Sequence, residues 1–134
     1  MGGEIRSHHD LKVWQLGMEI TEKIYAITST FPADERFGLI AQLRRAASSI
    51  PANIAEGNGR ASTREFLRHI SIAIGSLCEV ETFIQLASRL KFGDAKLFQE
   101  ILEELAEEGR MLRGLQRSLA AKIKPEFSPP TTSH

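Results

Sequence analysis

The residues best suited to chemistry in this 134-residue chain are arginines that recur at helical spacing. Arg60, Arg64 and Arg68 step by four and therefore share one face of a helix. They lie around the predicted start of that helix, where free backbone N–H groups and guanidinium groups both suit a phosphate. The spacing predicts a nucleic-acid contact, with Arg44 and Arg45 as further candidates. Solvated or intersubunit arginines explain the same spacing, and no aromatic stacking platform or recognition-helix motif accompanies it.

Other residues that could carry chemistry lack partners at useful spacing. Four-helix bundles often bind two metals through glutamates and histidines three residues apart on two helices. Here the only histidine within a predicted helix is His69, and Glu65 precedes it by four residues. Cys78 lies next to the predicted core residue Leu77, so a small buried thiol is expected rather than a nucleophile. We therefore predict no catalytic residue, no metal, no cofactor and no enzymatic activity.

The composition is that of one globular domain, with 42% apolar and 25% charged residues and a net charge of zero. The charge is unevenly distributed. Six arginines and two glutamates give residues 36–69 a net +4, whereas three basic and eight acidic residues give residues 71–108 a net −5. This asymmetry fits either a basic recognition face or two helices that attract each other. One cysteine, no secretory-signal pattern and no apolar run of about 20 residues lead us to expect a cytoplasmic protein without a membrane span.

Apolar periodicity predicts four helices, of which the first spans about residues 11–30. Asp10 is available as its N-cap, and Phe31-Pro32 ends it. The second helix opens at Pro32 or Asp34. Its apolar stripe is Phe37, Ile40, Leu43, Ala47, Ile50 and Ile54. Pro51 falls inside this run and predicts a kink.

The third helix has the clearest pattern, running from a capping box at Ser62 and Glu65 to about residue 90. Asp94 caps the fourth helix, whose acidic residues are assigned to its outer face: Glu100, Glu103, Glu104, Glu107 and Glu108. Long helices joined by short loops predict an all-α fold, an antiparallel up-and-down four-helix bundle. We divide the chain into a flexible N-terminal arm (1–9), the bundle (10–123) and a disordered tail (124–134).

The first predicted helix carries more apolar surface than a single bundle needs. Trp14, Met18 and Tyr25 lie beside its main stripe, which predicts a second buried surface. Polar residues adjoin the apolar stripes of the second and third helices: Arg44, Arg45, Ser49, Asn53, Glu56, Ser76, Glu79 and Thr82. A solvated face, a hydrogen-bonded network across a subunit interface and a direct ligand contact are all open for these residues.

The chain also resembles a known family through segments spread over about residues 8–92. These are Asp10-Leu-Lys-Val-Trp14, Ile24-Tyr25, Phe31-Pro32, Glu35-Arg-Phe-Gly-Leu39, Gln42-Leu-Arg-Arg-Ala-Ala47, Ser49-Ile-Pro-Ala-Asn-Ile-Ala-Glu-Gly57, Gly59-Arg60, Ser62, Glu65-Phe66, Gly75-Ser76-Leu77, Glu79, Glu81 and Thr82. Together they resemble the four-helix bundle family also called the 23S rRNA intervening-sequence protein family.

The resemblance implies a closed homo-oligomer, a pentamer with a central channel, which would account for the extra apolar surface of the first helix. The similar accessory proteins of diversity-generating retroelements form pentameric barrels that bind nucleic acid and a reverse transcriptase. The family has no established catalytic activity. Carried onto this chain, its motif residues become candidates for interface or binding roles: Arg44, Arg45, Asn53, Glu56, Arg60, Glu79 and Glu81. Trp14, Met18 and Tyr25 complete the predicted oligomer interface.

Two hypotheses of function follow. The first is a non-enzymatic homo-oligomeric scaffold that binds RNA or DNA weakly through the arginines. The alternative is a protein–protein adaptor, for example one that docks a reverse transcriptase, without direct nucleic-acid contact.

Overall fold

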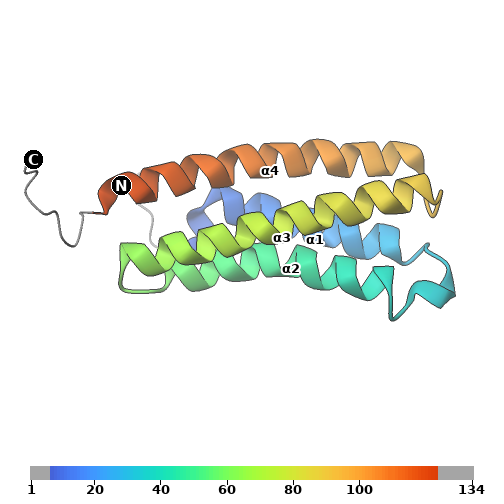
Figure 1. Ribbon diagram of the computed structural model, residues 1–134, viewed down its shortest axis with the longest axis horizontal. Helices are drawn as coiled ribbons and strands as arrows, with labels where there is room; N and C mark the ends of the chain where they lie inside the picture. Colours follow the sequence, from blue (N-terminus) through green and yellow to red (C-terminus); the bar gives the residue numbers. More distant parts are fainter. Residues whose placement is uncertain (1–6, 124–134) are drawn as a thin grey trace, which may run out of the picture.

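Within the part of the chain that the structure describes, four long helices lie side by side along one axis, and consecutive helices run in opposite directions (Figure 1). The computed structural model describes residues 7–123. They form η1 (His8–Asp10), α1 (Lys12–Thr28), η2 (Ala33–Glu35), α2 (Leu39–Asn58), α3 (Thr63–Arg89) and α4 (Ala95–Lys122), with no strand among them. The predicted all-α four-helix fold is confirmed. Residues 1–6 of the predicted arm and the predicted tail, 124–134, lie outside the described residues.

The start of α1 differs from the prediction. Leu11 is its N-cap, and no side chain of residues 7–123 hydrogen-bonds the free amides there. Asp10 instead accepts the Ser7 N–H at 3.3 Å, while the Ser7 hydroxyl accepts the His9 N–H at 3.2 Å. The prediction that Asp10 caps the first long helix was wrong, because Asp10 belongs to the capping box of the short turn before it.

The second helix begins at Leu39 rather than at Pro32 or Asp34. The 3₁₀ turn η2 occupies the intervening segment, and the Glu35 carboxylate accepts the Leu39 N–H at 3.1 Å. Phe37, predicted in the apolar stripe, lies between the two elements and is 87% exposed. That assignment was wrong because the helical period does not extend through a separate turn.

Pro51 is buried inside α2, which continues through it as one element. A proline removes the donor for the carbonyl four residues earlier, here that of Ala47. The Thr21 hydroxyl of α1 lies 3.1 Å from the Ala47 oxygen and 2.8 Å from the Gly17 oxygen. Thr21 therefore offers a donor to the carbonyl that Pro51 leaves unbonded, and this bond connects α1 to α2.

Both predicted N-cap residues of the last two helices are confirmed, although of the predicted capping box at Ser62 and Glu65 only the bond to the Ser62 side chain is found. The Ser62 hydroxyl accepts the Glu65 N–H at 3.0 Å at the start of α3, and the Asp94 carboxylate accepts the Lys96 N–H at 2.8 Å at the start of α4. Each side chain satisfies one of the amides that a helix start leaves without an intrahelical partner.

The end of α3 is a Schellman motif. The Phe92 N–H bonds the Ala87 carbonyl at 3.1 Å, and the Lys91 N–H bonds the Ser88 carbonyl at 3.0 Å. Lys91 has a φ of 60°, the left-handed conformation that glycine usually occupies at this position. The chain thereby reverses into the short connection to α4.

Glu108 of α4 is buried in the core with no exposed surface, so its assignment to the outer face was wrong. Gly17 of α1 makes room for it, because a Cβ at that position would lie 3.1 Å from Glu108 Oε2. Neither carboxyl oxygen has a hydrogen-bond partner within residues 7–123. Burial, with a smaller contribution from the charge of Glu107, raises the pKa of Glu108 to about 8. Glu108 is therefore mostly protonated at neutral pH.

Candidate nucleic-acid interface

Three of the predicted arginines lie at the end of the bundle where α2 turns into α3 (Figure 1). All three are exposed, but only Arg64 and Arg68 lie on α3, because the helix begins at Thr63. The prediction that Arg60 shares their helix face was wrong, since Arg60 lies in the loop between α2 and α3. Arg60 donates to Glu56 at 2.6 Å and Arg68 donates to Glu65 at 3.2 Å. The hydrogen bond from Arg60 holds the pKa of the Glu56 carboxyl below its ordinary value. Two of the three predicted phosphate ligands thus already have carboxylate partners, although exposed ion pairs are weak enough for a phosphate to compete.

Behind these arginines, the buried His69 belongs to a polar network between α2 and α3. The Asn53 amide nitrogen donates to the Ser49 carbonyl at 2.9 Å and to the Ser49 hydroxyl at 3.0 Å. Its Oδ1 therefore accepts from His69 Nδ1, at 3.0 Å. The other ring nitrogen, His69 Nε2, then points toward the exposed charged residues and lies 3.4 Å from an Arg68 nitrogen and 3.8 Å from Glu56 Oε2. Asn53, predicted at an oligomer interface, has its amide hydrogen-bonded within its own chain.

Gly57 allows α2 and α3 to approach each other closely. A Cβ at this position would lie 2.7 Å from the His69 Cβ and 3.0 Å from Phe66 Cδ1. Further along the same pair of helices, the Ser49 and Ser76 hydroxyl oxygens are 2.9 Å apart. The Ser49–Gly57 segment, which carries much of the family resemblance, therefore packs α2 against α3 through small residues and hydrogen bonds between the two helices.

Arg44 and Arg45 lie apart from the other arginines. With a rise of 1.5 Å per residue, Arg45 is about 20 Å from the end of α2 at Asn58, beyond which Arg60 lies. Arg44 lies between α1 and α2, where it donates to the Thr28 hydroxyl at 2.9 Å and to the Tyr25 carbonyl at 3.2 Å and stacks 4.5 Å above the Tyr25 ring. These contacts assign Arg44 to the packing of the bundle. The Arg45 side chain is exposed and makes no hydrogen bond or ion pair with the part of the chain that is described.

The predicted interface residues of α1 are partly exposed. Met18 is 39% and Tyr25 is 46% exposed. Trp14 is half-buried against the core, with its ring near those of His8 and His9. The aromatic and apolar surface predicted beside the main stripe of this helix is therefore present, although Trp14 is partly covered by the turn before α1.

A second set of exposed apolar side chains lies on α3, where none was predicted from the sequence. Ile72, Leu86 and Leu90 are 40%, 43% and 50% exposed. Glu79 is exposed and lies seven residues from both Ile72 and Leu86, so the three share one face of the helix. Gly75 faces open space near them, because a Cβ added to its backbone would meet no atom of a neighbouring element within 4 Å. Glu81, also predicted at the interface, is half-buried.

The α3 helix is also apolar enough, by length and composition alone, to cross a membrane, with a mean hydropathy of 1.4 over 18 residues. It is the one helix of residues 7–123 that meets this criterion. The core helix of a soluble bundle meets the same criterion, and α3 contributes Ile70, Ala73, Leu77, Val80 and Ile84 to the core. The composition of α3 is therefore weak support for a membrane span.

Residues 7–123 contain no group of three or more histidine, cysteine or acidic side chains arranged to hold a metal. Cys78 is exposed, so its prediction as a buried thiol was wrong. It lies one residue beyond Leu77, and that step of 100° carries its side chain out of the core stripe.

Two further features of the structure were not predicted from the sequence. Glu108 occupies a core position, and the signal was present: Ile101, Leu105, Glu108 and Leu112 follow the three–four spacing of the core stripe. The second is a pocket between α1 and α4. It arises from how two helices pack, and residue spacing within either helix gives no signal for it.

The four antiparallel helices of residues 7–123, with a closely packed α2–α3 pair, define this part of the protein as an all-α four-helix bundle. Comparison with protein families matches residues 9–114 to the 23S rRNA-intervening sequence protein family. The match covers most of the chain, and the protein belongs to this family. The resemblance found in the sequence is thereby confirmed.

Among solved structures, the chain is similar to a protein of unknown function from the S23 ribosomal protein family of Bacteroides thetaiotaomicron. The identity is 22% and the TM-score is 0.71, over 78% of this chain and 98% of the other. At this identity the likeness supports the shared fold alone. A search of curated proteins finds no match.

Proposed function

We propose that the protein is a non-enzymatic, homo-oligomeric scaffold of the cytoplasm that binds RNA or DNA weakly through the arginines at the α2–α3 end. The observation that supports assembly is the apolar surface left exposed on α1 and α3. Its members are Met18, Tyr25, Ile72, Leu86 and Leu90. Large apolar side chains gathered on one helix face are typical of surfaces that a partner covers. The form we propose is the closed pentamer that the family resemblance implies.

Charge adds a specific contact to this proposed interface. Glu79 lies between Ile72 and Leu86 on the exposed face of α3, and Arg45 is exposed on the neighbouring α2. Neither makes an ion pair with residues 7–123. An arginine and a glutamate that flank the same apolar surface suit a pair formed between two copies, because such pairs fix register and exclude wrong partners.

Sedimentation analysis of the wild type and of three substitutions, Ile72→Ser, Glu79→Arg and Arg45→Glu, tests assembly. Glu79→Arg should convert the oligomer to smaller species, and Arg45→Glu with Glu79→Arg in one chain should restore it. Glu103→Arg, which reverses a charge on α4, serves as the control and should leave the mass unchanged. A wild-type chain that sediments as one folded copy at micromolar concentration would refute the proposal.

Nucleic-acid binding is supported by three exposed arginines next to the start of α3, where the backbone amides also favour an anion. Because Arg60 and Arg68 already have carboxylate partners, we expect weak affinity with strong salt dependence. Fluorescence anisotropy of labelled RNA and DNA at two salt concentrations measures both properties.

The matched variants carry equal charge changes at opposite ends of the bundle. Replacing Arg60, Arg64 and Arg68 with alanine should weaken binding and flatten the salt dependence by roughly 0.9 for each phosphate of duplex DNA that is no longer neutralised. Replacing the exposed residues Arg36, Arg89 and Lys96 with alanine should change neither. Absence of binding at low salt, or equal losses in both variants, would refute the arginine end as the contact.

The exposed apolar face also favours a second candidate, a protein–protein adaptor that docks a partner such as a reverse transcriptase without touching nucleic acid. In that case the arginine variants retain whatever nucleic acid co-purifies with the complex. Ile72→Ser and Leu86→Ser should then abolish capture of the partner while the oligomeric mass is unchanged.

A further inference from the structure

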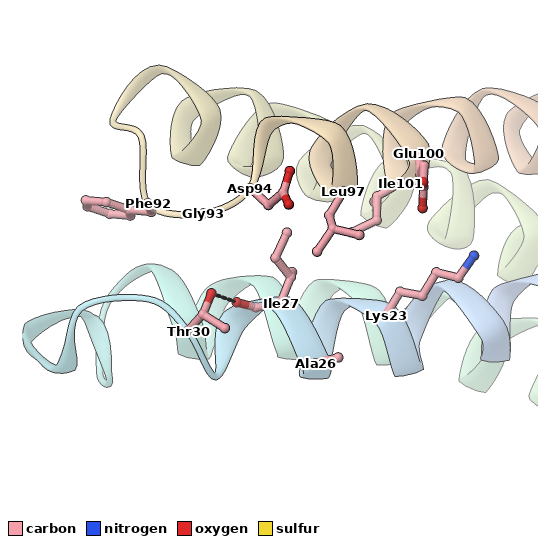
Figure 2. Close-up of a pocket in the computed structure, with 10 residues that line it drawn as sticks. All are labelled: Lys23, Ala26, Ile27, Thr30, Phe92, Gly93, Asp94, Leu97, Glu100 and Ile101. Carbon is pink, nitrogen blue, oxygen red and sulfur yellow. Dashed lines mark hydrogen bonds between the residues drawn. The ribbon is translucent and has the colours of Figure 1, made fainter.

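A pocket of about 500 Å³ lies between α1 and α4, at the opposite end of the bundle from Arg60 (Figures 1 and 2). Leu97 and Ile101 project from α4 toward Ile27 of α1, as Figure 2 shows. Phe92 and Gly93, in the connection between α3 and α4, border the pocket on the side of the turn. The volume lies within the range of small-molecule sites in proteins.

The interior of this pocket is apolar. Ile27 and Ile101 are core residues, 4% and 2% exposed, whereas Leu97 is 44% exposed and presents its side chain to the opening. The Gly93 backbone lies against this interior, since a Cβ there would be 3.2 Å from the Phe98 ring and 3.6 Å from Ile27. A ligand that fills the pocket therefore needs an apolar body, because burying apolar surface is the main gain available there.

The charged residues around the opening are Lys23, Asp94 and Glu100. Lys23 is neutralised by an ion pair with Glu104, and that hydrogen bond raises the pKa of Lys23. Asp94 uses one carboxylate oxygen to cap α4. Glu100 makes no hydrogen bond or ion pair with residues 7–123. The charge of Glu100 also acts on Lys23, but three carboxylates, those of Asp94, Glu100 and Glu104, lie near this one ammonium group. The opening therefore keeps a net negative charge beside an apolar interior, and this arrangement favours a cationic ligand.

We propose that this pocket is a binding site for a small amphipathic amine. Its apolar body would contact Ile27, Leu97 and Ile101, and its ammonium group would bind Glu100 with Asp94 nearby. An apolar carboxylate is disfavoured because the single cation at the opening already has a partner. The site uses no residue of the proposed interface or of the arginine end, so it is independent of the proposed function.

Three probes that share a naphthylmethyl group and differ in charge test the proposal: 1-naphthylmethylamine (a cation), 1-naphthylmethanol (neutral) and the anion of 1-naphthaleneacetic acid. Titration of the full-length protein, followed by NMR of its amide groups, gives the affinity and the location of each probe. The amine should bind tightest and the carboxylate weakest, with shifts centred on Gly93, Leu97 and Ile101.

The matched variants are Glu100→Gln and Glu103→Gln, two neutralisations on α4 of which only the first lies at the pocket. Glu100→Gln should weaken amine binding about two- to fivefold and leave the alcohol unchanged, the range that an exposed charge pair supports. Glu103→Gln should alter neither. Leu97→Asn, at an exposed position, should weaken all three probes, with circular dichroism confirming the fold.

The proposal is overturned if the carboxylate binds as tightly as the amine, or if the shifts map outside the pocket. It is also overturned if Glu100→Gln leaves amine affinity unchanged, or if no probe gives a saturable shift at millimolar concentration.

Discussion

The substitution Glu108→Gln should make the stability of this protein much less dependent on pH. Glu108 is fully buried, and its pKa in the folded protein is about 8, against an ordinary value of 4.5. The folded state therefore binds more protons than the unfolded state between pH 4.5 and 8. The free energy of unfolding falls as pH rises through this range, is highest below it and levels off above it.

The magnitude follows from the two pKa values. Each pH unit between them costs about 1.4 kcal/mol, so ionisation of Glu108 lowers the free energy of unfolding by about 3 kcal/mol at pH 7 and about 5 kcal/mol above pH 9. Glutamine keeps the shape of the protonated carboxyl and has no charge to bury. We therefore expect the variant to be more stable than the wild type by an amount that grows from pH 5 to pH 9.

Urea denaturation followed by circular dichroism at 222 nm, at five pH values from 5 to 9 and one protein concentration, measures this difference. Glu107→Gln is the control, because Glu107 is the exposed neighbour of Glu108 and contributes only part of its pKa increase. The control should retain most of the pH dependence. Parallel curves for the wild type and Glu108→Gln over the whole range would refute the assignment of a raised pKa to this buried carboxyl.

Three further substitutions test the packing by the same denaturation assay. Gly57→Ala should destabilise the protein by about 1–3 kcal/mol, because the new Cβ would lie 2.7 Å from a side-chain carbon of α3. Gly59→Ala is the control and should cost under about 1 kcal/mol, because the nearest atom to its Cβ would be 3.6 Å away. Equal effects of the two substitutions would argue against a close approach of the helices at Gly57. Thr21→Val should cost about 1–3 kcal/mol by leaving the Ala47 carbonyl without a donor, and Thr21→Ser should retain most of the stability. Lys91→Gly should stabilise the protein by about 1 kcal/mol, because glycine adopts a φ of 60° without steric cost; a loss of stability would contradict the Schellman geometry.

Helix number, order and most core positions could be predicted because apolar periodicity and capping residues act locally. Ser62 and Asp94 cap their helices as predicted, and the apolar residues of α3 that recur at helical spacing from Ile70 to Ala87 are buried. The errors arose where local pattern and tertiary packing diverge. Phe37 continued the period of α2 but lies in a separate turn, and Glu108 was assigned to the surface by its charge although its spacing placed it in the core.

The candidate site was less predictable because its properties depend on contacts between helices. The common face of Arg64 and Arg68 on α3 followed from their spacing, whereas Arg60 lies in the loop before that helix; all three are exposed. The contacts of Arg44 with α1 did not follow from α2 alone. The exposed apolar face of α3 could not be predicted either, because an apolar residue beside the core stripe is covered or exposed according to where the neighbouring helices lie.

The internal bonding of the Ser49–Gly57 segment makes the protein a suitable framework for engineering. Ser49 and Asn53 hydrogen-bond each other and residues of α3, and Gly57 lets the two helices approach, so these contacts between α2 and α3 involve no exposed charged side chain. Exposed positions outside the proposed interfaces, such as Arg89, Lys96 and Glu103, can therefore be randomised in a library while this segment is kept constant. Selection from such a library would yield new binding specificities on an unchanged scaffold.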